Sequence, residues 1–207
     1  LQEEANYFYG KLHGAVVKYH VNGQRMHEGK WVLGLQDSLM QSWSAEGILL
    51  EKGWYFEDDK AGLWEYFHHT GDTMLVEEHT DSATFIWIKR KPNGQSMIEN
   101  GAGVLTDFFE DERIKTETRY DLGLPSGEHK EYFRDGELRV GGGYLGGKRD
   151  GSWIEYYRGK KSKQESNYVN GLLDGEFIEN YRNEQQNVAG SYLSGLKTGE
   201  WVWHFED

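Results

Sequence analysis

A 24-residue spacing of aromatic residues limits what this chain can fold into more than any other feature. One series consists of Tyr7, Trp31 and Tyr55, and a second consists of Tyr120, Tyr144, Tyr168 and Tyr192. The series differ in phase, since Tyr55 and Tyr120 are 65 residues apart. This is seven residues short of a whole number of periods, and we place the loss between Gly94 and Gly103. Such self-similarity is typical of repeat proteins, in which each unit packs on its neighbours.

Glycines follow the aromatic residues at fixed distances. Those that lie seven residues after an aromatic residue, or one period before Gly127, are Gly14, Gly62, Gly103, Gly127, Gly151, Gly175 and Gly199. Many glycines also follow Asn or Asp, as in Asn170-Gly171 and Asp150-Gly151. These dipeptides provide the positive φ angles of two-residue hairpin turns. We therefore predict a turn at each glycine column.

The segments between the glycines are short and rich in residues that favour strands. They are about 5–10 residues long and contain many Tyr, Trp, Phe, Val, Ile and Thr residues. An apolar column, interrupted only by His129, includes Val16, Met40, Trp64, Trp153 and Trp201. The pattern predicts an all-β fold, an elongated and twisted antiparallel β-meander of stacked β-hairpins.

Two segments resemble a known repeat. Tyr144–Gly159 (YLGGKRDGSWIEYYRG) and Tyr192–Trp201 (YLSGLKTGEW) are similar to the MORN-type repeat in its 24-residue bacterial variant, the YwqK-like antitoxin repeat family. The resemblance covers nearly the whole chain after residue 6. It implies a single repeat domain over 1–207 with one hairpin per unit and no catalytic residues. The implied units are 7–30, 31–54, 55–78, a degenerate 79–95, 96–119, 120–143, 144–167, 168–191 and 192–207.

Composition excludes several classes of protein. The chain has 35 acidic and 23 basic residues, a net charge of −12, and no cysteine. Without cysteine it can form no disulfide, Cys-ligated zinc site or iron–sulfur cluster. The negative charge argues against a nucleic-acid partner, which requires a basic surface. No stretch of 18 apolar residues is present, so we expect no membrane span. The resemblance implies a bacterial protein, and we expect it to be either cytoplasmic or exported as a mature chain without its leader.

The residues that could carry chemistry do not form a recognisable site. His68, His69 and His79 lie near Glu77 and Glu78, but adjacent histidines on a strand point to opposite faces, and no HExxH motif is present. The acidic run at 57–59 and the run at 110–112 fall at expected turns and lack the spacing of a calcium loop. We therefore expect no enzyme, no catalytic residue, no metal and no cofactor.

The tryptophans of the apolar column allow two interpretations. Trp64, Trp153 and Trp201 share one repeat position. Stacked rings of this kind pack adjacent hairpins together, and exposed rings could also form a flat platform for sugars. We predict core packing and keep a ligand platform as the alternative.

These features favour a protein whose role is to bind another protein. The resemblance implies an antitoxin-like or immunity-like module. The negative net charge of the chain favours a basic partner such as a toxin. One alternative is a scaffold component of a bacterial cell-envelope or secretion assembly. Another is a glycan-binding surface protein that uses the tryptophan column. An exposed edge strand could also form a homodimer.

Overall fold

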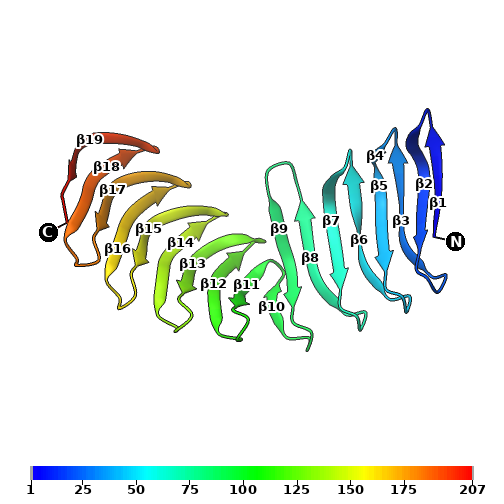
Figure 1. Ribbon diagram of the computed structural model, residues 1–207, viewed down its shortest axis with the longest axis horizontal. Coiled ribbons are helices and arrows are strands. Elements are labelled where there is room, and N and C mark those ends of the chain that lie inside the picture. Colours follow the sequence, from blue (N-terminus) through cyan, green and yellow to red (C-terminus); the bar gives the residue numbers. More distant parts are fainter. Residues whose placement is uncertain (1, 207) are drawn as a thin grey trace. The chain divides into compact units, whose positions relative to one another are not determined.

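The computed structural model describes residues 2–206, and all nineteen regular elements in that range are β-strands (Figure 1). The chain divides into two compact units. The first ends at Gly101 and contains β1–β10, and the second begins at Ala102 and contains β11–β19. No helix of the described residues is long and apolar enough to cross a membrane.

The strands of the first unit are β1 Glu3–Phe8, β2 Lys11–Tyr19, β3 Arg25–Val32, β4 Leu35–Gln36, β5 Ser38–Trp43, β6 Leu49–Phe56, β7 Asp59–Phe67, β8 Thr73–His79, β9 Thr84–Arg90 and β10 Ser96–Glu99. The strands of the second unit are β11 Ala102–Phe108, β12 Ile114–Asp121, β13 Leu124–Tyr132, β14 Leu138–Leu145, β15 Lys148–Tyr156, β16 Ser162–Val169, β17 Leu172–Asn180, β18 Gln186–Leu193 and β19 Leu196–Trp203.

Each unit is an antiparallel meander in which strands pair in chain order. In the first unit, pairing runs from β1–β2 through β3–β5 to β9–β10, and the two-residue β4 pairs with β3. In the second unit it runs from β11–β12 to β18–β19. The predicted all-β fold of antiparallel hairpins is confirmed. The four-residue β10 lies in the segment where the sequence predicts a seven-residue loss.

Two kinds of turn alternate along the chain. Asn170 and Gly171 have φ angles of 52° and 85° and join β16 to β17 as a two-residue turn. At the opposite ends of the strands, the loops have three residues inside the closing hydrogen bond, as where the His20 N–H donates to the Gln24 carbonyl over 2.8 Å. The Gly23 N–H donates to the His20 carbonyl over 2.9 Å, and only Gly23 in that loop has positive φ. This is a type I turn closed by a glycine bulge, so the rule that Asn-Gly dipeptides form two-residue turns is wrong for Asn22-Gly23.

The glycine column that includes Gly151 does not form turns, and this part of the prediction is wrong. Gly151 has a φ of 74° but lies inside β15, directly opposite Tyr168. The turn at 146–147 has already reversed the chain four residues earlier. The register between β14 and β15 shifts in this region, which is the mark of a β-bulge. Gly127 and Gly175 likewise face Tyr144 and Tyr192.

Hydrogen bonds link successive hairpins at both ends of the strands. At the two-residue turns, the Gly171 N–H donates to the Arg149 carbonyl over 2.8 Å, and Gly195 donates to Leu173 over 2.8 Å. At the other end, the Tyr157 hydroxyl donates to the Asn180 carbonyl over 3.1 Å. Tyr181, His20 and His68 contact carbonyls 22 or 23 residues ahead in the same way. These hairpins are therefore attached to their neighbours at the ends of their strands.

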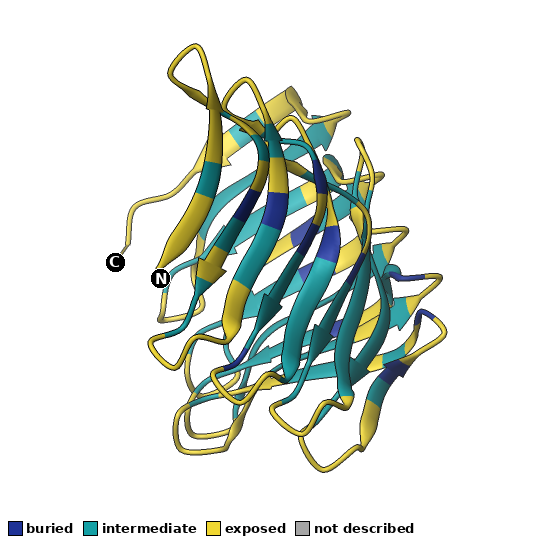
Figure 2. Cartoon of the chain, turned by 90° about the vertical axis from the view of Figure 1, so that its right-hand side faces the viewer, coloured by how far each residue is buried: buried dark blue, intermediate teal, exposed yellow. Residues whose placement is uncertain are grey.

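The core is a line of side chains on one face of each sheet, which we call the packed face. Val16, Met40, Trp64 and Trp153 are buried there, as the apolar column predicts. His129 occupies the same column and is also buried, with its Nδ1 2.8 Å from the Thr118 hydroxyl. Figure 2 shows buried residues within strands and exposed residues at most turns. The opposite face, which we call the open face, carries the residues that alternate with this column.

Each tryptophan of the column is enclosed by the same kinds of residue, an arrangement that we call the cage. The Trp153 ring lies on Gly142, meets Tyr144 edge-to-face at 5.1 Å, and has the Arg149 guanidinium 4.0 Å from its centroid. The cages of Trp64 and Trp201 have the same four kinds of residue. Where the column holds Val16, Met40, His129 or Phe177, the position of the cation holds Leu12, Gln36, Pro125 or Leu173. A cation thus occurs where an indole ring is available for a cation–π contact.

We expect Gly142→Ala to destabilise the second unit by about 1–3 kcal/mol, the usual cost of overpacking. A Cβ atom at Gly142 would lie 2.2 Å from the Trp153 ring. Gly141→Ala is the matched control, because a Cβ atom there meets nothing closer than 3.6 Å. Urea unfolding followed by tryptophan fluorescence measures both changes. Equal stability of the two variants would contradict the cage.

Candidate functional site

The tryptophans predicted as a possible ligand platform lie on the packed face. Trp64 is 0% exposed and Trp153 is 3% exposed. Each ring is covered by a glycine and by a cationic side chain, so these two rings offer no open face to a sugar. Trp201 is half-buried, and its indole N–H has no hydrogen-bond partner among residues 2–206. The structure therefore places the column where it holds hairpins together.

An exposed aromatic cluster lies instead on the open face of the first unit. Trp54 precedes the packed Tyr55 by one residue, so its side chain points to the opposite face. It is 57% exposed and directly faces Leu39 on β5. Phe56 on β6 and Leu63 on β7 are also exposed and alternate with packed-face residues. We call Leu39, Trp54, Phe56 and Leu63 the Trp54 patch.

An acidic turn borders the Trp54 patch. Glu57 and Asp58 form the two-residue turn between β6 and β7, with φ angles of 50° and 73°, and Asp59 follows. The Asp58 carboxylate accepts the Gln36 N–H over 2.5 Å, so it holds this turn against the preceding hairpin. Among the described residues, the Glu57 and Asp59 carboxylates form no ion pair. Lys60 does not neutralise them, because its ammonium lies over the Trp64 ring on the packed face.

Sequence reasoning missed this patch, although the sequence contains a signal for it. The aromatic spacing selects Tyr55, and Trp54 is out of that spacing by one residue. In a strand, neighbouring side chains point to opposite faces of the sheet, so a residue one position away from a packed-face residue lies on the open face. The same rule places Leu39 beside Met40 and Leu63 beside Trp64 on the open face.

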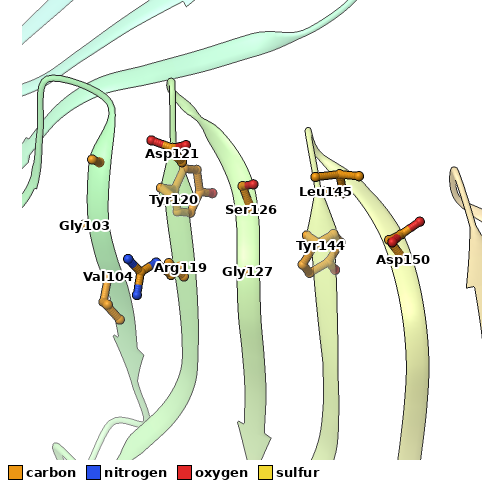
Figure 3. Close-up of a pocket in the computed structure, with 11 residues that line it drawn as sticks. Gly103, Val104, Arg119, Tyr120, Asp121, Ser126, Gly127, Tyr144, Leu145 and Asp150 are labelled. Carbon is orange, nitrogen blue, oxygen red and sulfur yellow. The ribbon is translucent and has the colours of Figure 1, made fainter.

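A hollow of about 660 Å³ lies in the second unit, at the ends of β11–β15 where the two-residue turns are (Figure 3). Tyr120, Tyr144, Arg119 and Asp150 are among its lining residues. It forms in a repeat that has Pro125 and His129 in place of the cation and tryptophan of the cage. Burial raises the pKa of Tyr120, so this phenol stays protonated. Asp150 accepts the Asn170 N–H over 3.4 Å and so supports the neighbouring turn.

The structure does not bring the histidine and carboxylate residues at 68–79 into one site. His68 lies beyond the end of β7, with its Nε2 3.3 Å from the Arg90 carbonyl. His79 lies at the far end of β8, 2.8 Å from the Glu77 carboxylate. Within residues 2–206, no group of three or more His, Asp or Glu residues is arranged to hold a metal ion.

Glu77 and His79 belong to a chain of polar contacts across β7 and β8. The Lys60 ammonium donates to the Tyr66 hydroxyl over 2.5 Å, and Tyr66 donates to Glu77 over 2.8 Å. Burial, together with the hydrogen bond to Glu77, raises the pKa of Tyr66. In the second unit, the Tyr132 hydroxyl donates to Glu117 over 2.7 Å, and burial with this bond raises the pKa of Tyr132 to about 12. Both tyrosines therefore act as hydrogen-bond donors that join neighbouring strands.

Comparison with known proteins does not assign the chain to a family. No protein-family model matches the sequence, and no curated protein matches it. The likeness to the 24-residue MORN-type repeat remains a resemblance based on the motif residues.

We expect the free energy of unfolding to fall as the pH rises from 10 to 12. An unfolded tyrosine loses its proton near pH 10, whereas folded Tyr132 keeps its proton up to about pH 12. The folded state therefore binds more protons in this interval, so stability declines with pH. Tyr132→Phe should weaken this decline. Urea unfolding at pH 9, 10 and 11 measures both slopes, and identical slopes would contradict the assignment.

Proposed function

We propose that the chain is a non-catalytic protein-binding module and that the Trp54 patch contacts its partner. The observation that carries this proposal is an exposed tryptophan surrounded by exposed apolar side chains on three strands paired side by side. Contiguous exposed apolar clusters with polar borders are typical of protein interfaces. Aromatic residues at the centre of such a cluster commonly provide much of the binding energy.

Charge favours a basic partner. Residues 1–101 contain 15 acidic and 9 basic residues, and residues 102–207 contain 20 and 14, so both units have the same acidic excess. Close to the patch, Glu57 and Asp59 add carboxylates that are not paired with a cation. A partner with Lys or Arg around an apolar centre would match this surface in charge and polarity.

Within this class we favour an antitoxin-like or immunity-like role, in which the module covers a basic toxin. The support is the acidic excess, the open-face patch and the resemblance to the YwqK-like repeat. A scaffold component of a bacterial envelope or secretion assembly would use the same surface. The glycan-binding alternative loses support, because the Trp64 and Trp153 rings are covered.

The experiment is affinity capture from the source cells, followed by binding measurements with the purified captured protein. We expect a basic protein that binds the wild-type chain more weakly as salt is raised. Trp54→Ala should weaken binding by at least about 2 kcal/mol, the scale of an interface hot spot. The variant should keep its fold, because the indole is mainly exposed.

Phe205→Ala is the matched control, since Phe205 is an aromatic residue that is 95% exposed and lies in the other unit. It should bind like the wild type. Equal losses in both variants, or a captured partner that is acidic and insensitive to salt, would overturn the proposal. For the antitoxin version, co-expression should relieve the toxicity of the captured protein with the wild type but not with Trp54→Ala.

A further inference from the structure

A row of exposed aliphatic side chains lies on the open face of the second unit, at the ends of the strands where the two-residue turns are. We call Leu145, Val169, Leu172 and Leu193 the aliphatic ridge. Their exposed fractions are 60%, 50%, 52% and 60%, respectively. They belong to β14, β16, β17 and β18, and each of these strands pairs with a neighbour on both sides. An exposed apolar patch of this kind usually marks an interaction site.

The register of the strands places these side chains on one face. Leu145, Val169 and Leu193 each follow a packed-face tyrosine of the 24-residue spacing, so they point to the open face. Leu172 lies directly opposite Val169 across its hairpin and shares that face. Lys148 lies opposite Leu145 in the same way and continues the row with its alkyl stem, and its ammonium is the one cation of the row. The row therefore has one member on each strand from β14 to β18.

Carboxylates are held beside the aliphatic ridge. The Asp150 carboxylate accepts the backbone N–H of the residue that follows Val169 over 3.4 Å. The Asp174 carboxylate accepts the backbone N–H of the residue that follows Leu193 over 3.0 Å. Glu176 is exposed on the open face of β17, opposite a residue that precedes a packed-face tyrosine. None of these three carboxylates forms an ion pair within residues 2–206. The ridge thus has an acidic border.

The spacing of the row matches an α-helix laid across the strands. Neighbouring strands lie about 4.8 Å apart, and an α-helix rises about 5.4 Å per turn. The residues at i, i+3, i+4 and i+7 of such a helix therefore meet about one strand per turn. The distance from β14 to β18 is about 19 Å, which corresponds to about 13 residues of helix. A partner strand cannot pair here, because the backbone groups of β14–β18 already pair on both sides.

We propose that the aliphatic ridge binds an amphipathic α-helix of a protein partner. The apolar stripe of the helix lies on the ridge, and Lys or Arg residues beside the stripe face Asp150, Asp174 and Glu176. This inference rests on the proposed role in protein binding and adds a second contact, in the unit that does not contain Trp54. The acidic border also disfavours an anionic lipid surface, because like charges repel.

A synthetic peptide tests the shape of the partner. The probe is a dye-labelled peptide of about 14 residues, built from Leu and Lys with Leu at helical spacing. Its control contains the same residues in strict alternation, which favours a strand. Fluorescence anisotropy with the full chain measures binding, and circular dichroism measures helix formation. We expect the helical peptide to gain helix on binding and to bind at least about tenfold more tightly than the control. Its binding should weaken as salt is raised.

Val169→Lys tests the location, because it places a cation in the middle of the aliphatic ridge. We expect it to weaken binding of the helical peptide by at least about tenfold. Val32→Lys is the matched control, since Val32 is 44% exposed and also follows an aromatic residue of the 24-residue spacing, but lies in the first unit. It should bind like the wild type, as should Trp54→Ala. If Val169→Lys is less stable in urea, Leu145→Lys repeats the test at a more exposed position.

Several results would overturn this inference. They are equal affinities for the two peptides, equal losses in Val169→Lys and Val32→Lys, and binding to phosphatidylcholine vesicles in place of the peptide. A loss in Trp54→Ala alone would put the helix on the Trp54 patch, which contradicts the ridge but supports the proposed function. Conversely, a peptide that does not bind at all leaves the proposed function intact, provided that the captured partner still requires Trp54.

Discussion

The packing of a ring from one strand onto a glycine of the preceding strand is the contact on which each sheet depends. A two-stranded hairpin has too little apolar surface to be stable alone. Trp153 overcomes this limit because Gly142 lets the indole lie directly on the backbone of β14, while Tyr144 and Arg149 close the cage. Burial is thus achieved between neighbouring strands of the same sheet. The energy that holds one hairpin comes chiefly from the hairpins beside it.

The two faces of a strand therefore have different roles. The packed face is committed to stability, since each of its rings is enclosed by residues from adjacent strands. The open face contributes less to the fold and can vary. Trp54, Phe56 and the carboxylates of Glu57 and Asp59 lie where a change alters what the chain binds more than whether it folds. A binding role is consistent with this separation, because interface residues can change while the cages stay.

The sequence predicts the strands and the core well, because both follow from spacing. The 24-residue period locates Trp64 and Trp153 in the core without any knowledge of structure. It does not distinguish a turn from a bulge, since Gly151 needs a positive φ in either case, and only the pairing with Tyr168 decides. It also favours residues that repeat, so it assigns no role to Trp54, which lies one residue outside the spacing. Binding residues are the ones least expected to follow the period.

The hydrogen bonds at the two ends of the strands restrict how such a chain can change in length. The bonds from Gly171 to Arg149 and from Tyr157 to Asn180 each span nearly one period. An insertion or deletion of a complete unit leaves every such bond with a partner, whereas a change of a few residues removes partners at both ends. Evolution should therefore lengthen or shorten this protein in whole units. An exception occurs near the short strand Ser96–Glu99, where the repeat is seven residues short.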